Sequence, residues 1–205
     1  MVVNHDSVNE SFPPIVAEHA SVLILGTMPG VASLTKQEYY GHPRNAFWPI
    51  MAALFGVNAT SDYPCRRQSL MDYGIAVWDV IRCCQREGSL DVKINKDSMQ
   101  VNNFNGFFER YPSIKHVFFN GGVAENLYCR YVRPNLDESF QVLLYQRLPS
   151  TSPAHASLSL AEKIKAWQVI KDVVSTMPSP KNEYQSVNGL MNTPELIGLK
   201  NRLID

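Results

Sequence analysis

Four short apolar segments, each followed by residues that break regular structure, constrain the fold of this chain more than any other feature. The segments are Val22–Gly26, Gly74–Ile81, Ile114–Phe119 and Phe140–Leu148. Apolar runs of this length are typical of buried strands. Each run stops at Gly, Pro, Ser, Asn or Asp, so we expect each strand to end in a loop.

Helical patterns lie between these runs. The clearest begins at Leu160 and continues to Met177, because apolar residues recur there at spacings of three and four. Ser157 or Ser159 can cap this helix, and Glu162 lies three residues after Ser159, as a capping box requires. The other expected helices are Phe47–Phe55, Met99–Tyr111 and Val123–Tyr131.

The alternation of strands and helices predicts an α/β fold, with a central, mainly parallel four-stranded sheet and helices on both faces. Ligands bind such sheets at the carboxyl ends of the strands. We therefore expect the functional residues at one edge of the molecule. Residues 1–178 are expected to form one domain. Residues 179–205, which contain Pro180 and Pro194, are expected to form a partly ordered C-terminal extension.

The composition is that of a soluble globular protein. Of the 205 residues, 45% are hydrophobic and 19% are charged, and no apolar run reaches the roughly 20 residues of a membrane span. Residues 1–11 are polar and acidic, so we expect no secretory signal and a cytoplasmic location. The formal net charge is zero, which argues against a generic nucleic-acid coat but is compatible with one local basic face.

The cysteines indicate neither a metal site nor a disulfide. Adjacent cysteines rarely bridge, and no CxxC pair occurs. We expect buried free thiols at all four positions, which are Cys65, Cys83, Cys84 and Cys129. No metal ion or other cofactor is expected.

The loop after the first apolar run and a segment ten residues later carry the most informative residues. Gly26–Gly30 reads GTMPG, and Tyr40–Trp48 reads YGHPRNAFW. Glycines permit tight turns and a close approach of the backbone to a ligand. GTMPG alone is equally typical of an ordinary turn between a strand and a helix. A Tyr, a His, an Arg and an Asn together on a long loop indicate function more strongly.

These segments, with a third, resemble the uracil-DNA glycosylase superfamily. GTMPG resembles its motif I, and YYGHPRNAFW is similar to the HPxNxFW segment of the mismatch-specific uracil/thymine glycosylases. LPSTSPAH, after the fourth apolar run, resembles motif II. Within the superfamily, the chain is most similar to the hypoxanthine (deoxyinosine)-DNA glycosylase branch, over Ser21–Met177.

The resemblance implies a monofunctional repair glycosylase that flips a deaminated base out of double-stranded DNA and hydrolyses its N-glycosidic bond. Hypoxanthine is the expected base, and uracil comes second. Superfamily members usually hold the attacking water with an Asp, Asn or Glu of motif I, where this chain has Met28, and a thioether cannot position water. In the hypoxanthine branch this role passes to the Asn of HPRN, which is Asn45. Asn45 can also cap the helix that begins near Ala46.

The resemblance also implies which residues hold the flipped base. Tyr40 stands where the mismatch glycosylases place a stacking Phe, although it can instead be a packed surface tyrosine. Asp79 stands where the uracil glycosylases place a base-reading Asn. It can accept from the N1–H of hypoxanthine, or it can serve in a local cap or ion pair. The other expected base-binding residues are Gly26, Thr27 and Met28.

The second loop is expected to contact DNA. Ser150 replaces the catalytic His of motif II, so this loop is expected to act as a phosphate clamp, with Ala154 and His155 where the family inserts a wedge into the minor groove. An ordinary serine-rich loop is the alternative. Asn120, after the third run, is expected chiefly to cap the helix after Gly122. The expected DNA-binding residues are His42, Arg44, Ser150, Thr151, Ser152, Ala154 and His155.

Three alternatives stand beside a hypoxanthine glycosylase. They are a mismatch-specific uracil/thymine glycosylase, a non-catalytic α/β protein that binds a nucleotide or nucleic acid, and a serine hydrolase. The hydrolase would use a serine of Ser150–Ser152 with His155, but no GxSxG elbow occurs. The two loops carry no carboxylate pair, so preorganised polar groups are expected to stabilise the transition state. We expect a monomer.

Overall fold

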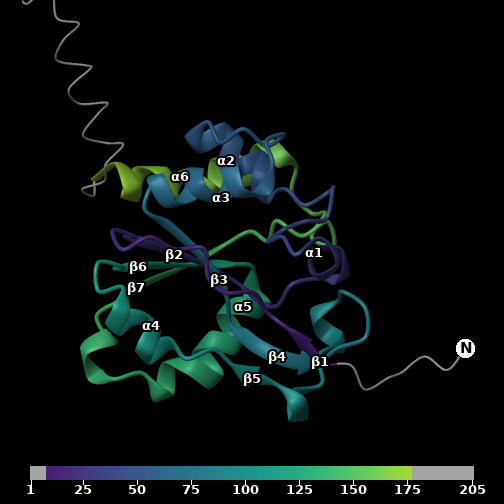
Figure 1. Ribbon diagram of the computed structural model, residues 1–205, viewed down its shortest axis with the longest axis vertical. Coiled ribbons are helices and arrows are strands. Elements are labelled where there is room, and N and C mark those ends of the chain that lie inside the picture. Colours follow the sequence, from purple (N-terminus) through teal and green to yellow (C-terminus); the bar gives the residue numbers. More distant parts are fainter. Residues whose placement is uncertain (1–7, 177–205) are drawn as a thin grey trace, which may run out of the picture.

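The computed structural model describes residues 8–176, and its centre is a four-stranded parallel sheet (Figure 1). The strand order is β3-β2-β6-β7. β2 (Val22–Gly26) pairs with both β3 (Ile75–Asp79) and β6 (His116–Asn120), and β6 also pairs with β7 (Leu144–Leu148). β2 and β3 are buried along their whole length, as their continuous apolar sequences predict.

Helices cover both faces of this sheet, which confirms the predicted architecture. One face carries α2 (Phe47–Phe55), α3 (Tyr63–Asp72) and α6 (Leu160–Thr176), and the other carries α4 (Phe104–Arg110) and α5 (Gly122–Leu127) (Figure 1). α2 and α6 also pack against each other. Because both faces are covered, a ligand can reach the sheet only at the ends of its strands.

A second sheet, which the sequence pattern does not predict, lies beside the first. It is antiparallel in the order β1-β4-β5, with β1 at Val8–Glu10, β4 at Ile81–Gln85 and β5 at Gln100–Val101. The connection from β4 to β5 contains two 3-10 turns, Asp91–Lys93 and Lys96–Ser98. This sheet extends the molecule beyond the end of β3.

The junction of the two sheets corrects one predicted strand. The run Gly74–Ile81 contains parts of two strands, because β3 ends at Asp79 and β4 begins at Ile81. The Val80 N–H donates to the Gly26 carbonyl at 2.9 Å, and the chain passes from one sheet to the other there. Val80 and Ile81 are both fully buried, so the apolar pattern continues through the break.

Three further boundaries differ from the prediction. The helix expected over Met99–Tyr111 is shorter, because the Asn103 side chain accepts from the Gly106 N–H and so caps α4. The helix expected over Val123–Tyr131 and the strand expected over Phe140–Leu148 are α5 and β7, which are also shorter. The residues between them include a π-helical turn, Tyr128–Val132, and two 3-10 turns, Arg133–Asn135 and Glu138–Phe140.

The capping box predicted for the last helix is confirmed. The Ser159 N–H donates to the Glu162 carboxylate at 2.8 Å, and the Glu162 N–H donates to the Ser159 hydroxyl at 3.3 Å. Further along α6, Trp167 is fully buried, and its indole N–H donates to the Pro149 carbonyl at 2.9 Å. α6 therefore fixes the start of the loop that follows β7.

The cysteines are free, but only two of them are buried. Cys83 and Cys84 are buried in β4, whereas Cys65 and Cys129 are exposed. The expectation of four buried thiols is wrong because Cys65 lies in the first turn of α3 and Cys129 in the π-helical turn, both at the surface.

No helix within residues 8–176 is long and apolar enough to cross a membrane. A short helix, α1 (Val31–Lys36), follows the Gly26–Gly30 loop. The C-terminal extension expected over residues 179–205 lies outside the described residues.

Candidate active site

A cavity of about 160 Å³ opens at the carboxyl ends of β2, β3 and β6, several times the volume of one water molecule. Ten of the thirteen predicted site residues line it, namely Gly26, Thr27, Met28, Tyr40, His42, Asn45, Asp79, Ser150, Thr151 and Ser152. The other three, Arg44, Ala154 and His155, lie outside its lining. The two loops singled out in the sequence therefore meet at one cavity.

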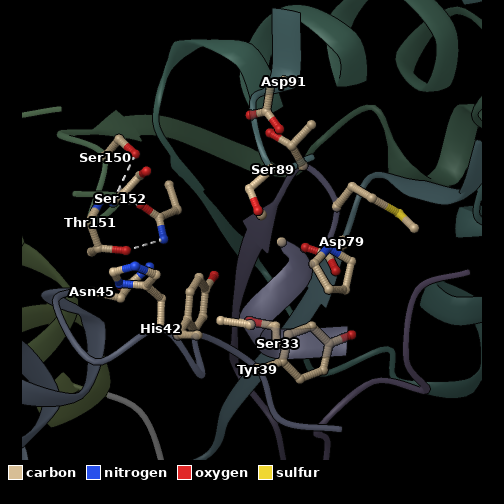
Figure 2. A pocket seen from close by; sticks show the side chains of 18 of the residues that line it. Ser33, Tyr39, His42, Asn45, Asp79, Ser89, Asp91, Ser150, Thr151 and Ser152 are labelled. Atoms are coloured by element: carbon tan, nitrogen blue, oxygen red, sulfur yellow. Dashed lines mark hydrogen bonds between the residues drawn. The ribbon is translucent and has the colours of Figure 1, made fainter. Parts of the chain in front are cut away.

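The polar groups of the cavity lie on different sides of it. Asn45, His42 and the Ser150–Ser152 segment gather on one side, and Asp79 lies on the other (Figure 2). Tyr39, which the sequence analysis did not single out, lies near Asp79 and donates its hydroxyl to a backbone carbonyl of the N-terminal segment at 3.0 Å. A ligand in the cavity would contact both sides.

Asp79 places a buried carboxyl group in the cavity. It lies opposite Gly26 in the register of β3 and β2, and a Cβ atom at position 26 would overlap Asp79 Oδ1. Only glycine leaves room for the carboxyl group there. The other oxygen, Oδ2, accepts from the Ser11 hydroxyl at 2.8 Å. The Asn102 amide donates to the Asp79 backbone carbonyl at 2.8 Å, so both the main chain and the side chain are held.

The surroundings of Asp79 raise the pKa of its carboxyl group to about 7. Burial is the main cause, and the negative charge of Asp91 adds to it. The Ser11 hydrogen bond and the Arg86 guanidinium lower the pKa and oppose these effects. Near neutral pH the group is close to the midpoint of its titration, so it can donate or accept a hydrogen bond.

A second carboxylate, Asp91, comes from a third segment and also lines the cavity, beside Ser89 (Figure 2). Its Oδ1 lies 3.6 Å from Nη1 of Arg86, whose side chain is fully buried. Burial raises the pKa of Asp91, and the Thr27 hydroxyl and Arg86 oppose that shift. No spacing in the sequence marks this residue. Within residues 8–176, no three His, Cys, Asp or Glu side chains are placed to hold a metal ion.

Arg86 also fixes the Gly26–Gly30 loop. Its guanidinium donates to the Met28 carbonyl at 3.4 Å and to the Pro29 carbonyl. The Met28 side chain packs against Ile81 in a small second core. Met28 therefore shapes the loop, and its thioether offers nothing that could hold a water.

Tyr40 lies in the cavity with one face of its ring covered. The ring stacks on Phe47, with 3.9 Å between centroids and 23° between planes. Its backbone is left-handed, with a φ of 56°, a conformation that residues with side chains adopt mainly where the surroundings enforce it. Its hydroxyl is buried and makes no hydrogen bond of normal geometry with a described residue. Burial and the Asp79 charge raise its pKa, and the nearby Asn120 amide opposes this shift. The predicted stacking role fits this placement and stays a prediction.

Asn45 lies just before α2 and also lines the cavity. Its Oδ1 accepts from the N–H of Phe47, the first residue of α2, at 3.0 Å, which fits the capping alternative, although the N-cap of α2 is Ala46. Its own N–H donates to the His42 carbonyl at 2.9 Å. Because the side chain also borders the cavity (Figure 2), positioning of a water is compatible with the cap and stays a prediction.

Thr151 joins three segments around the cavity. Its N–H donates to Asn120 Oδ1 at 2.8 Å, and its hydroxyl accepts from Asn120 Nδ2 at 2.8 Å. Its carbonyl accepts from the Ala46 N–H at 2.9 Å. Thr151 thus ties the loop after β7 to the end of β6 and to the start of α2, one residue from Asn45.

These bonds correct one expectation and bear on a second. Asn120 does not cap α5, whose N-cap is Gly121 without a side-chain bond, because the Asn120 amide is bound to Thr151. Thr151 is only 1% exposed, so its hydroxyl is poorly placed for a phosphate. Ser150 and Ser152 are half-buried in the same loop and remain the candidates for that contact.

The predicted wedge lies beside the cavity. Ala154 is exposed and His155 is half-buried, and the Lys163 ammonium group donates to the His155 carbonyl at 2.8 Å. The His155 ring lies 3.3 Å from the Ser157 hydroxyl, and no hydrogen bond joins it to Ser150–Ser152. This pairing argues against the serine hydrolase alternative.

The sequence matches a known family over most of its length. The family model described as the uracil DNA glycosylase superfamily matches residues 13–190, which include both loops and the whole parallel sheet. The chain belongs to this superfamily. It is therefore a DNA glycosylase, an enzyme that hydrolyses N-glycosidic bonds in DNA.

Individual relatives agree with the family. A hypoxanthine DNA glycosylase of Methanosarcina barkeri is 38% identical over 113 residues, which cover 55% of this chain and 70% of the relative. A hypoxanthine DNA glycosylase of Methanosarcina acetivorans is 36% identical over 118 residues, covering 57% and 73%. The solution NMR structure of a candidate uracil DNA glycosylase from Methanosarcina acetivorans has a TM-score of 0.69 at 30% identity, over 82% of this chain and 99% of that one.

Proposed function

We propose that this glycosylase removes hypoxanthine from double-stranded DNA. The observation that carries the proposal is the buried Asp79 carboxyl group, which lines the cavity at the end of β3 and can accept from the ring N1–H of hypoxanthine. Adenine has no N1–H and would place a ring acceptor against the ionised carboxylate, the form that prevails above about pH 7. The site thus favours the deaminated base over the normal one. The names of the two Methanosarcina relatives support the same substrate.

Tyr40 would provide the platform for the flipped base. Its ring is already fixed against Phe47, so little conformational freedom is lost when a base stacks on it. The Gly26–Gly30 loop, held from behind by Arg86, would form the adjoining wall. In this arrangement, stacking supplies affinity and Asp79 supplies the choice of base.

Asn45 would orient the attacking water. The water oxygen bonds to C1′ of the sugar as the C1′–N9 bond breaks, the electron pair of that bond leaves with the base, and the proton that the water loses passes to the departing base or to solvent. An amide orients water without accepting its proton, so the rate depends on how well the charges of the transition state are stabilised. Asp91 adds negative charge to the cavity, which favours the positive charge that develops on the sugar.

The rim of the cavity would bind the DNA backbone. Ser150, Ser152 and His42 lie at the cavity, and Arg44 is exposed on the first loop, where it can reach a phosphate. Ala154–His155 would enter the minor groove as the wedge. All of these groups come from one chain, so we propose that the enzyme acts as a monomer.

The test is an excision panel. The protein is incubated with labelled duplexes that carry hypoxanthine, uracil, xanthine or a thymine mismatch, and abasic sites are then cleaved with alkali. We expect the fastest excision with hypoxanthine. A preference for uracil or thymine mismatches would instead support the mismatch-specific alternative. DNA binding without excision of any base would support the non-catalytic alternative.

A further inference from the structure

We propose that Ser11 determines the specificity of this site by limiting Asp79 to one hydrogen bond with the base, which excludes guanine. The inference rests on the proposed function and goes beyond it. Guanine and hypoxanthine both present an N1–H next to the O6 carbonyl, and guanine differs only by the amino group at C2. The enzyme must therefore reject a normal base that has the same reading edge as its substrate.

Ser11 reaches Asp79 from behind the cavity. It follows β1, and its N–H donates to the Arg82 carbonyl of β4 at 2.7 Å. Its hydroxyl donates to Asp79 Oδ2 at 2.8 Å. Ser11 is not among the residues that line the cavity, whereas Asp79 and Gly26 are. Oδ2 is thus turned toward Ser11, and Oδ1 lies over the Gly26 α-carbon at the cavity.

The number of carboxylate oxygens that face the base decides which purine can form all of its hydrogen bonds. A carboxylate with two free oxygens can accept from the N1–H and the 2-amino group of guanine side by side, as two parallel hydrogen bonds. Asp79 presents only Oδ1 to the base, because the Ser11 hydrogen bond holds Oδ2 toward the back of the cavity. One acceptor satisfies hypoxanthine, which has one N–H on this edge. With guanine, the 2-amino group would be buried without a partner, and such a loss discriminates strongly between ligands.

Three other side-chain acceptors around the cavity already hold a donor or a cation. Asn120 Oδ1 accepts from the Thr151 N–H at 2.8 Å. Asn45 Oδ1 accepts from the Phe47 N–H at 3.0 Å. Asp91 is paired at 3.6 Å with a buried guanidinium group. The Tyr40 hydroxyl has no hydrogen bond, but it belongs to the ring on which the base would stack, so it lies outside the plane of the base. Removal of the Ser11 hydrogen bond would allow both oxygens of Asp79 to turn toward the N1–H and the 2-amino group.

The test compares two duplexes that differ only in the 2-amino group, hypoxanthine·T and guanine·T in the same sequence. The measurement is made at about pH 8.5, where Asp79 is ionised. We expect the wild type to excise hypoxanthine at least about 100-fold faster than guanine. Ser11→Ala should reduce this ratio by about tenfold or more, because Oδ2 becomes free to turn toward the base and accept from the amino group. Ser11→Thr keeps the hydroxyl and should keep the ratio.

A second readout separates this role from a merely structural one. The Ser11 hydrogen bond lowers the pKa of Asp79, so its removal should shift the acid limb of hypoxanthine excision to higher pH in Ser11→Ala and not in Ser11→Thr. If Ser11→Ala does not fold, Ser11→Cys takes its place, because a thiol has a similar size and is a weak donor.

The outcomes are distinct. A reduced ratio in the Ala or Cys variant, with a normal ratio in Ser11→Thr, supports the inference. An unchanged ratio in a folded Ala or Cys variant overturns it and leaves the proposed function intact. A wild type that excises no hypoxanthine overturns both.

Discussion

Gly26 and Asp79 share one space at the ends of β2 and β3. The two residues are paired in register, and Asp79 Oδ1 lies where a side chain at position 26 would begin. A buried carboxyl group in one strand thus requires a missing side chain in the next. Under the proposed function, position 26 is therefore as important for base recognition as the carboxyl group itself.

We expect Gly26→Ala to displace Asp79 and to lower hypoxanthine excision about 100-fold, since a shift of about 1 Å at a reading group can cost that much. Overpacking should also destabilise the fold by about 1–3 kcal/mol, measured by chemical denaturation. Gly122→Ala is the matched control, because a Cβ atom there meets only Arg147, at 3.5 Å. The double variant Gly26→Ala/Asp79→Ala should regain stability without activity. Full excision by Gly26→Ala alone would disprove this dependence.

Excision should rise with pH through about 7, the pKa of Asp79, if the ionised carboxylate reads the base. Well below that pH, kcat/KM should fall by about tenfold per pH unit, because protonation removes the acceptor. In Asp79→Asn this fall of kcat/KM at low pH should disappear, together with most of the preference for hypoxanthine over adenine. The measurement is kcat/KM between pH 5 and pH 9, roughly the range in which the group titrates. A limb that survives in Asp79→Asn would assign the titration to another group.

Substitutions can separate the two roles of Asn45, which are capping of α2 and positioning of the water. Asn45→Ala removes both, so excision should be largely lost and stability should fall by about 1 kcal/mol, as for other lost helix caps. Asn45→Ser keeps an oxygen that can cap α2 but removes the amide, so stability should be retained while excision is still lost. DNA affinity should change little in either variant. Wild-type excision by Asn45→Ser would leave Asn45 with a capping role alone.

Thr151→Val should destabilise the protein by about 1–3 kcal/mol, because Asn120 Nδ2 then remains buried without its partner. Thr151→Ser keeps the hydroxyl and should be close to wild type. Thermal unfolding of the two variants gives the comparison. Equal stability of the Val and Ser variants would show that water or another group satisfies the amide.

Arg86→Met should cost about 3–5 kcal/mol, since it leaves the Met28 and Pro29 carbonyls and Asp91 without a buried cation. Adding Asp91→Asn to this variant should recover part of the loss, because the uncompensated charge is removed. The readout is the free energy of unfolding of the single and double variants. No recovery in the double variant would mean that the carbonyl bonds, and not the ion pair, carry the effect.

The parallel sheet and its two loops could be predicted because short stretches of consecutive residues indicate both of them. The runs that became β2 and β3 are continuous and apolar, the run of β6 ends in the apolar Val117–Phe119, and all three stop at residues that break strands. Parallel strands end at one edge of a sheet, so GTMPG and LPSTSPAH had to approach each other. The Ser159–Glu162 capping box is local in the same sense and was equally predictable.

The part of the site that could not be predicted depends on contacts between residues that are distant in the sequence. Ser11 meets Asp79 across 68 positions of the sequence, and Asn120 meets Thr151 across 31. Asp91 reaches the cavity through the second sheet, whose strands are too short and too mixed in polarity to be recognised. A serine, an asparagine and an aspartate have ordinary roles in turns and caps, so only the assembled fold distinguishes them.

The bonds of Thr151 have a mechanical consequence. One buried residue couples the loop after β7, the end of β6 and the turn that carries Asn45, so a shift in one of them should displace the others. Under the proposed function, strain applied where this loop binds the phosphates would be transmitted to the side chain that orients the water. The effects of substitutions in the two loops on excision should accordingly be non-additive when the substitutions are combined, as expected for residues of one coupled structural unit.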